Sequence, residues 1–133
     1  MSVKDVTKLP TAGIQLDYDV SALSGNTTTM YVGFDNGRVK SLTTSGVYAE
    51  LTTKVKLPGK IISIVYTGVS GYAIAAALED GHIYTFGTDG SALGLFKDLN
   101  MGIAKMYYYS NYLYVILKTT QQEKSNLIKI QMA

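Results

Sequence analysis

The only histidine of the chain follows two acidic residues at a tight turn. His82 comes directly after Glu79-Asp80-Gly81. An imidazole beside a carboxylate can take up and release a proton near neutral pH, so the pair could act as acid and base. In the related segment 44 residues earlier the same position holds Arg38, and a polar residue that opens a strand after an exposed turn is usually solvated. We therefore predict no catalytic residue here and treat His82 as a candidate ligand-binding residue.

Two carboxylates form the second candidate site. Asp17 and Asp19 are two positions apart, and residues i and i+2 of a strand face the same side, so the pair could hold Ca²⁺ or act as acid and base. Neither recurs in the other repeats, and no D-x-D-x-D-G loop supports calcium binding. One histidine without cysteine also leaves too few zinc ligands. We predict no metal and no cofactor, and keep both carboxylates as candidate ligand-binding residues.

Five tyrosines are concentrated between positions 106 and 114. A tyrosine ring offers a flat apolar face with a hydroxyl at its edge, which suits sugars and partner side chains. Tyr108 has tyrosine counterparts in the related strands and is expected to fill space between repeats. Tyr107, Tyr109 and Tyr112 have none. We predict that these three rings are ligand-binding residues at the surface.

Length, composition and charge define the class of protein. The 133 residues suit one domain, and 47% hydrophobic with 17% charged residues is typical of a folded chain. A net charge of +2 gives no strong field to attract nucleic acid or anionic membrane, and the absence of cysteine excludes disulfides and thiol catalysis. The N-terminal MSVKDVTKLP lacks the apolar stretch of a secretion signal. We expect a soluble protein, cytoplasmic or virion-associated, of microbial or viral origin.

The chain repeats itself at a shift of 44 positions. Met30 to Gly46 then falls on Ile74 to Gly90, and Asn36-Gly37 falls on Asp80-Gly81. Both glycines sit where hairpin turns need a positive φ, which glycine adopts most easily. The 13 glycines, 11 tyrosines and many Val, Ile and Thr residues favour short strands between turns, so we predict an all-β fold.

Each repeat is predicted to have four strands. First strands are expected at Ile14–Val20, Ile61–Thr67 and Ile103–Tyr109, and fourth strands at Tyr48–Leu57 and Ala92–Leu99. The chain ends before a fourth strand of the third repeat, so Val3–Leu9 is predicted to supply an outer strand. The predicted division is a single domain, 1–133, with an outer strand at 3–9 and repeats at 14–57, 61–99 and 103–131.

These repeats resemble blade repeats of β-propellers, of the quinoprotein-like and WD40-like kind. The resemblance rests on MYVGFDNGRVKSLTTSG and AIAAALEDGHIYTFGTDG: an apolar strand, an Asn/Asp-Gly turn, and a strand that ends at another glycine turn. It implies three four-stranded antiparallel blades in this chain. Because propellers commonly hold four to eight blades, we predict a homodimer with one six-bladed ring, in which Val3–Leu9 of one chain pairs with Leu127–Ile130 of the other. A β-trefoil monomer is the alternative, since three repeats of this length suit it as well.

The fold analogy predicts a non-catalytic binding or assembly module that engages another macromolecule. Its partners would be a second copy of the chain, another protein or a glycan, with neither nucleic acid nor membrane expected. The alternative is a lectin-like carbohydrate-binding protein that uses the tyrosines. A small hydrolase or lyase that uses Asp17, Asp19 or His82 is a third hypothesis.

Overall fold

The computed structural model describes residues 18–118 and 126–132. Within these ranges the chain forms eleven strands and no helix. The strands are β1 (Val20–Gly25), β2 (Thr29–Phe34), β3 (Arg38–Thr43), β4 (Tyr48–Lys56), β5 (Ile61–Tyr66), β6 (Ile74–Leu78), β7 (His82–Phe86), β8 (Gly94–Asp98), β9 (Ile103–Tyr109), β10 (Tyr112–Leu117) and β11 (Leu127–Gln131). They form three antiparallel sheets, named here sheet one (β1–β4), sheet two (β5–β8) and sheet three (β9–β11).

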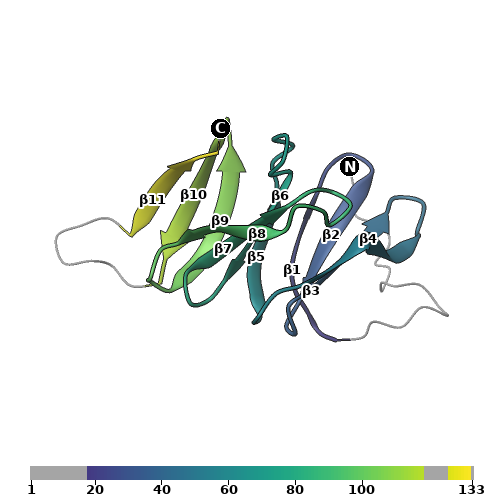
Figure 1. Cartoon of the computed structure of the whole chain (residues 1–133), viewed down its shortest axis with the longest axis horizontal. Coiled ribbons are helices and arrows are strands. Elements are labelled where there is room, and N and C mark those ends of the chain that lie inside the picture. Colours follow the sequence, from purple (N-terminus) through teal and green to yellow (C-terminus); the bar gives the residue numbers. More distant parts are fainter. Residues whose placement is uncertain (1–17, 119–125, 133) are drawn as a thin grey trace, which may run out of the picture.

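The three sheets lie next to one another, with sheet three at the left and sheet one at the right of Figure 1. In each sheet, strands that follow one another in the chain are neighbours. The first strands are adjacent in space, because β5 contacts β1 on one side and β9 on the other. Each sheet therefore starts at a shared inner line and runs outward, as propeller blades do. This is a propeller-like arrangement and not the β-trefoil alternative.

The predicted repeat is confirmed in its central hairpins. β6 follows the last five residues of β2 by 44 positions, and β7 follows β3 by the same distance. The turns between them contain Gly37 at φ 90° and Gly81 at φ 107°, so both glycines adopt the positive φ that the alignment requires.

The core consists of two apolar layers, one on each side of sheet two. Phe86 and Ile74 face sheet one, whereas Ile83 and Ala77 face sheet three, and all four are fully buried. Three consecutive alanines of β6 are also fully buried, and their small side chains let the neighbouring sheets approach. A strand covered on both faces is apolar at every position, which explains the continuous IAAAL of β6.

Serine side chains connect the inner strands of neighbouring sheets. The Ser63 hydroxyl on β5 donates to the Met106 carbonyl and accepts from the Met106 amide, both at 3.1 Å. The Ser24 hydroxyl on β1 accepts from the Tyr66 amide at 3.3 Å. Inner strands are sheet edges with unpaired backbone groups, so these contacts satisfy part of the edge and fix the sheets relative to one another.

One strand prediction is wrong, and another lies outside the described residues. The first strand of the first repeat was expected at Ile14–Val20, but β1 begins at Val20. Only three residues connect β1 to β2, whereas seven connect β5 to β6, so β1 lies nearer to β2 than the alternating apolar pattern of Ile14–Val20 predicts. Residues 14–17 and the predicted outer strand Val3–Leu9 lie outside the described residues. The part of the chain that the structure describes contains no helix that could span a membrane.

Candidate functional site

One face of sheet three is open and aromatic. Because side chains directly opposite one another in a sheet share a face, the register of β9, β10 and β11 places nine side chains together. From β9 to β11 they form the rows Tyr109–Tyr112–Gln131, Tyr107–Tyr114–Lys129 and Lys105–Ile116–Leu127. We call these nine residues the tyrosine face. The opposite face of β10 carries Leu113, Val115 and Leu117, which are buried in the layer between sheets two and three.

The tyrosine face is accessible over most of its area. Tyr109 is 72% exposed, Leu127 53% and Tyr107 50%, while Tyr112 and Tyr114 are half-buried with ring centroids 6.4 Å apart. Lys129 Nζ lies 4.1 Å from the centroid of the Tyr112 ring, a cation–π contact. The face combines large apolar area, hydroxyl groups and two lysines with no carboxylate, which is a composition suited to binding protein side chains.

The three tyrosines singled out from the sequence lie on this one face, although their binding role stays a prediction. Sequence reasoning missed Tyr114, Ile116 and Leu127, which belong to the same face. A signal was present, because Tyr112, Tyr114 and Ile116 are spaced by two in YLYVIL and must share a side of a strand. Tyr108 is half-buried and packs against the layer between sheets two and three, as expected from its counterparts.

The corresponding face in the other two sheets packs on the next sheet along the chain. In sheet one it carries Tyr31 and Val39, which contribute to the layer shared with sheet two. In sheet two it carries Ala77 and Ile83, which contribute to the layer shared with sheet three. The tyrosine face therefore occupies the position at which a further sheet would pack.

Sheet one has exposed apolar side chains on its face at the other end of the row. Val20, Leu23 and Met30 are exposed there and share a face through the β1–β2 register, together with half-buried Leu42 opposite Met30. We call these four residues the sheet-one end face. Val32 and Phe34 on the same side are buried. Of the eleven large hydrophobic residues that are exposed in the described part of the chain, six lie on the two ends of the row, which concentrates apolar surface there.

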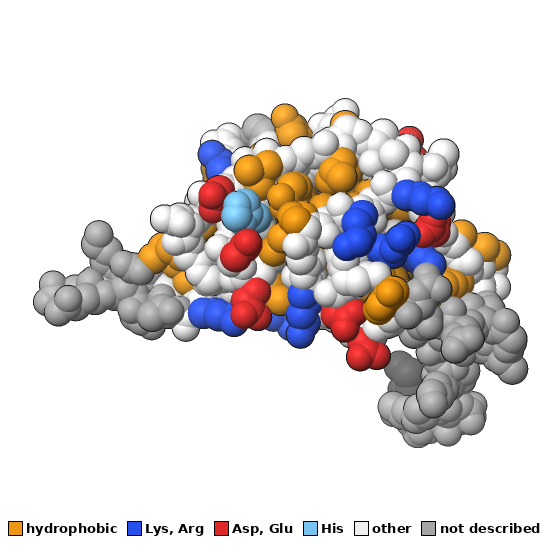
Figure 2. Space-filling model, turned by 60° about the horizontal axis from the view of Figure 1, so that its bottom comes forward, with side chains coloured by type: hydrophobic (Ala, Val, Ile, Leu, Met, Phe, Trp, Pro, Cys, Tyr) orange, Lys and Arg blue, Asp and Glu red, His pale blue; other side chains and the backbone are white. Residues whose placement is uncertain are grey.

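His82 lies between two carboxylates at the outer edge of sheet two. Its Nδ1 is 2.8 Å from Asp80 Oδ1 and its Nε2 is 3.4 Å from Asp98 Oδ2. The hydrogen bond with Asp80 raises the pKa of His82, and the same bond lowers the pKa of Asp80. Figure 2 shows the histidine in pale blue with acidic groups on either side. The contact with Asp80 agrees with the sequence hypothesis, whereas Asp98 was not foreseen.

The predicted pair of carboxylates, Asp17 and Asp19, is described only in part. Asp19 is exposed and precedes β1, where its carbonyl accepts a hydrogen bond from the Asp35 amide at 3.1 Å. The expectation that Asp19 lies within an inner strand is therefore wrong, and Asp17 lies outside the described residues. A cavity of about 230 Å³ along the inner strands is lined by residues that include Ser21, Ser63 and Lys105 but no carboxylate. Among the described residues, no group of three or more metal-binding side chains comes together.

Three antiparallel sheets that run outward from adjacent first strands define a β-propeller-like all-β protein. The sequence matches no protein-family model, and it has no match among curated proteins. Similar solved structures are BBS1N in complex with ARL6DN soaked with lead (TM-score 0.65, 19% identity), the mercury-soaked form of that complex (0.67, 18%), and Sqt1 of Saccharomyces cerevisiae (0.59, 14%). The matches cover 90%, 90% and 96% of this chain but only 36%, 36% and 35% of those chains. The likeness supports the propeller-like fold. This chain spans about a third of the length of each of those chains.

Proposed function

We propose that the chain is a non-catalytic protein-binding and assembly module whose tyrosine face packs on the sheet-one end face of a second copy. The observation that carries this proposal is the exposure of apolar residues at both ends of the row. Tyr107, Tyr109 and Leu127 lie at one end, and Val20, Leu23 and Met30 at the other. Monomeric proteins rarely leave such faces open to water.

Repeat equivalence supports a second copy as the occupant. Sheets one and two each pack the face that corresponds to the tyrosine face against the next sheet, which contributes its opposite face. The sheet-one end face corresponds to that opposite face. A two-fold rotation would join each tyrosine face to the end face of the other copy and make two identical joints. The result would be a ring of six sheets, which lies within the usual range for propellers.

The edge of sheet three supports the same arrangement. Sheets one and two have four strands, whereas three are described in sheet three, with β11 at its outer edge. The outermost strand of a sheet can pair with a further strand. The sequence prediction that residues 3–9 of one copy add to β11 of the other would supply the fourth strand. Those residues lie outside the described part of the chain, so this strand stays a prediction.

A protein partner beyond the second copy is also proposed. The solved structures of BBS1N contain ARL6DN bound to it, and turns at the rim of a ring are available for such contacts. We do not propose catalysis by His82, because both ring nitrogens already face carboxylates. The lectin-like alternative rests on the high exposure of Tyr109. Glycan-array binding that is lost in Tyr109→Ala but unaffected by the state of assembly would favour it.

The mass of the chain in solution tests the ring. Light scattering after gel filtration should give twice 14.4 kDa at micromolar concentration. Leu127→Lys should release monomers, because it puts a charge into the apolar joint. Leu95→Lys is the matched control, because Leu95 on β8 is as exposed as Leu127, 53% in each case, but lies on neither end of the row. A wild-type monomer, or equal effects of the two variants, would contradict the proposal.

Deletion of residues 1–9 tests whether these residues contribute a strand to the joint between the two copies. If they supply the missing strand in trans, the truncated chain should run as a monomer or lose its cooperative unfolding transition. A stable dimer after deletion would remove the strand exchange from the proposal and leave the packing of the faces intact.

A further inference from the structure

The outer corners of sheets one and two have the same backbone but opposite charge. The sheet-one corner consists of Asn36, Arg38 and Lys56, and the sheet-two corner of Asp80, His82 and Asp98. In both, the turn side chain accepts a hydrogen bond from the strand amide two residues on, at 3.1 Å. In both, the glycine carbonyl of the turn accepts from the residue that follows the outer strand. The two corners can therefore be compared position by position.

The cross-strand pair differs between the corners. In sheet two, His82 lies directly opposite Asp98, and the two side chains are 3.4 Å apart. In sheet one, Arg38 lies directly opposite Lys56. Like charges directly opposite one another destabilise a sheet. Sheet one thus has two cations at the position where sheet two pairs the His82 imidazole with the Asp98 carboxylate.

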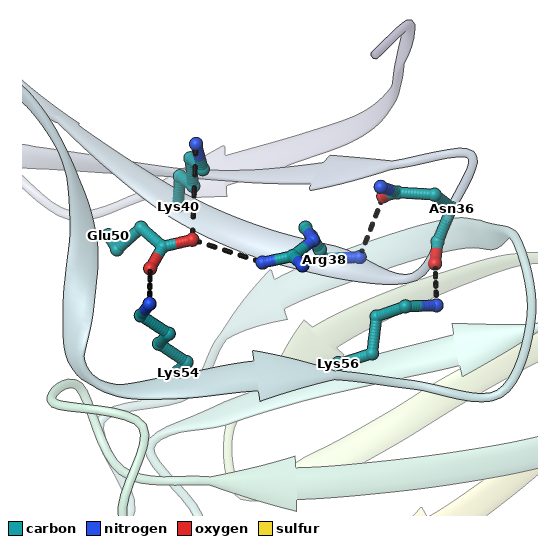
Figure 3. A network of polar contacts seen from close by, with 6 residues as sticks. All are labelled: Asn36, Arg38, Lys40, Glu50, Lys54 and Lys56. Carbon is teal, nitrogen blue, oxygen red and sulfur yellow. Dashed lines mark hydrogen bonds and ion pairs between the residues drawn. The ribbon is translucent and has the colours of Figure 1, made fainter. Parts of the chain in front are cut away.

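In the part of the chain that the structure describes, Glu50 is the carboxylate that contacts the cations at and beside the sheet-one corner. Glu50 Oε1 is 3.3 Å from Arg38 and 4.0 Å from Lys40, and its Oε2 is 3.4 Å from Lys54. Lys56 Nζ donates to the Asn36 carbonyl at 2.5 Å. Figure 3 shows the Glu50 carboxylate between Arg38 and Lys54, with Lys56 on the other side of Arg38. Glu50 thus contacts three cations, and Lys56 is not one of them.

The corner is open to a partner. The Lys54 side chain is 74% exposed and that of Arg38 is 40% exposed, and Lys56 is exposed as well. Figure 2 shows a group of basic side chains on the same surface as the histidine. Sheet two shows that packing of a neighbouring sheet leaves this position accessible, because the side chains of His82 and Asp98 remain 33% and 46% exposed beside sheet one. Closure of a ring at sheet one would therefore leave its corner available.

We propose that the sheet-one corner binds an acidic segment of a partner protein, with a carboxylate between Arg38 and Lys56. The chain itself contains the precedent, since the Asp98 carboxylate occupies the equivalent position beside His82 in sheet two. That precedent favours a carboxylate over a phosphate as the bound group. The site would serve the partner binding proposed above, but it is complete in a single copy of the chain.

Binding of a labelled hexaglutamate peptide, followed by fluorescence anisotropy at low salt, tests the site. Arg38→Gln and Lys56→Gln should each weaken binding by about tenfold, as expected for loss of one charge from a defined contact. Lys97→Gln removes an exposed lysine from β8 and should leave affinity unchanged. Lys56→Asp, which places an internal carboxylate where sheet two has Asp98, should abolish binding. Circular dichroism checks that each variant is folded.

Three outcomes would overturn the proposal. Equal losses in Lys97→Gln and Arg38→Gln would mean general charge attraction without a site. Undiminished binding in Lys56→Asp would place the peptide elsewhere. Tighter binding of tripolyphosphate or of an oligothymidylate, with the same loss in Arg38→Gln, would identify a phosphate site in place of an acidic segment. The experiment measures peptide affinity and not mass, so its outcome does not depend on whether the ring forms.

Discussion

Replacement of Gly37 by alanine should destabilise the fold through backbone contact as well as through φ. Gly37 has a φ of 90°, and a Cβ built on it would lie 2.1 Å from the Leu57 carbonyl oxygen and 2.9 Å from that of Gly59. The same turn is held by a hydrogen bond from the Leu57 amide to the Gly37 carbonyl at 2.8 Å. Neither the Gly37 backbone nor the Leu57 backbone can move away without weakening that hydrogen bond.

Gly46 provides the matched control. Its φ is 95°, nearly that of Gly37, but nothing lies within 4 Å of a Cβ built there. Gly46→Ala should therefore cost only the conformational penalty, about 1 kcal/mol. Gly37→Ala adds displacement of packed backbone, for which about 2 kcal/mol is a reasonable magnitude. We expect a total loss near 3 kcal/mol for Gly37→Ala.

Urea unfolding followed by far-ultraviolet circular dichroism measures both losses. The variants must be compared at one protein concentration, because association contributes to apparent stability. Equal losses at Gly37 and Gly46 would refute the close approach of the β2–β3 turn to the end of β4. A loss below about 0.5 kcal/mol at both would refute the positive φ itself.

Two further predictions concern the core and His82. Phe86→Ala should cost about 3 kcal/mol because Phe86 is fully buried. The sequence predicts an equal cost for Leu42→Ala, but Leu42 is only half-buried, so its cost should be smaller in dilute protein and should rise with concentration if the ring forms. Because the pKa of His82 is raised in the folded state, the stability that it contributes is complete below about pH 6.5 and is lost as pH rises through the folded pKa. The melting temperature of the wild type should therefore fall between pH 6 and pH 9 relative to His82→Gln, and parallel curves for the two proteins would refute the contact with Asp80 and Asp98.

Strand positions could be predicted where turn residues limit them on both sides. The prediction for 103–109 coincides with β9, and that for 61–67 extends one residue beyond the end of β5. Each segment has an alternating or continuous apolar pattern between turn residues, so local sequence determines its ends. The prediction of the first strand is wrong because the alternating apolar pattern of Ile14–Val20 does not reveal that the β1–β2 connection is shorter than its counterpart.

Charge pairs across strands could not be predicted, because register depends on irregularities that local sequence does not reveal. Val39 is opposite Val55, but the next residue, Lys40, is opposite Glu50. The residues between Glu50 and Val55 therefore bulge out of the ladder. Without that bulge Lys56 would not lie opposite Arg38, and the sheet-one corner would not exist. The same limit applies to Asp98, which meets His82 across another irregular pairing.

The middle sheet explains why the two ends of the row are available for binding. Sheet two buries both of its faces, and the alanines of β6 and the large residues of β7 supply both apolar layers. Stability of the single chain thus depends on two joints that are already complete. Sheets one and three need only one face each for those joints, so their other faces are free of that requirement and can carry tyrosines, lysines and exposed aliphatic residues. Substitutions on the tyrosine face should therefore change association while leaving the unfolding of the monomer unchanged, which separates a binding role from a structural one.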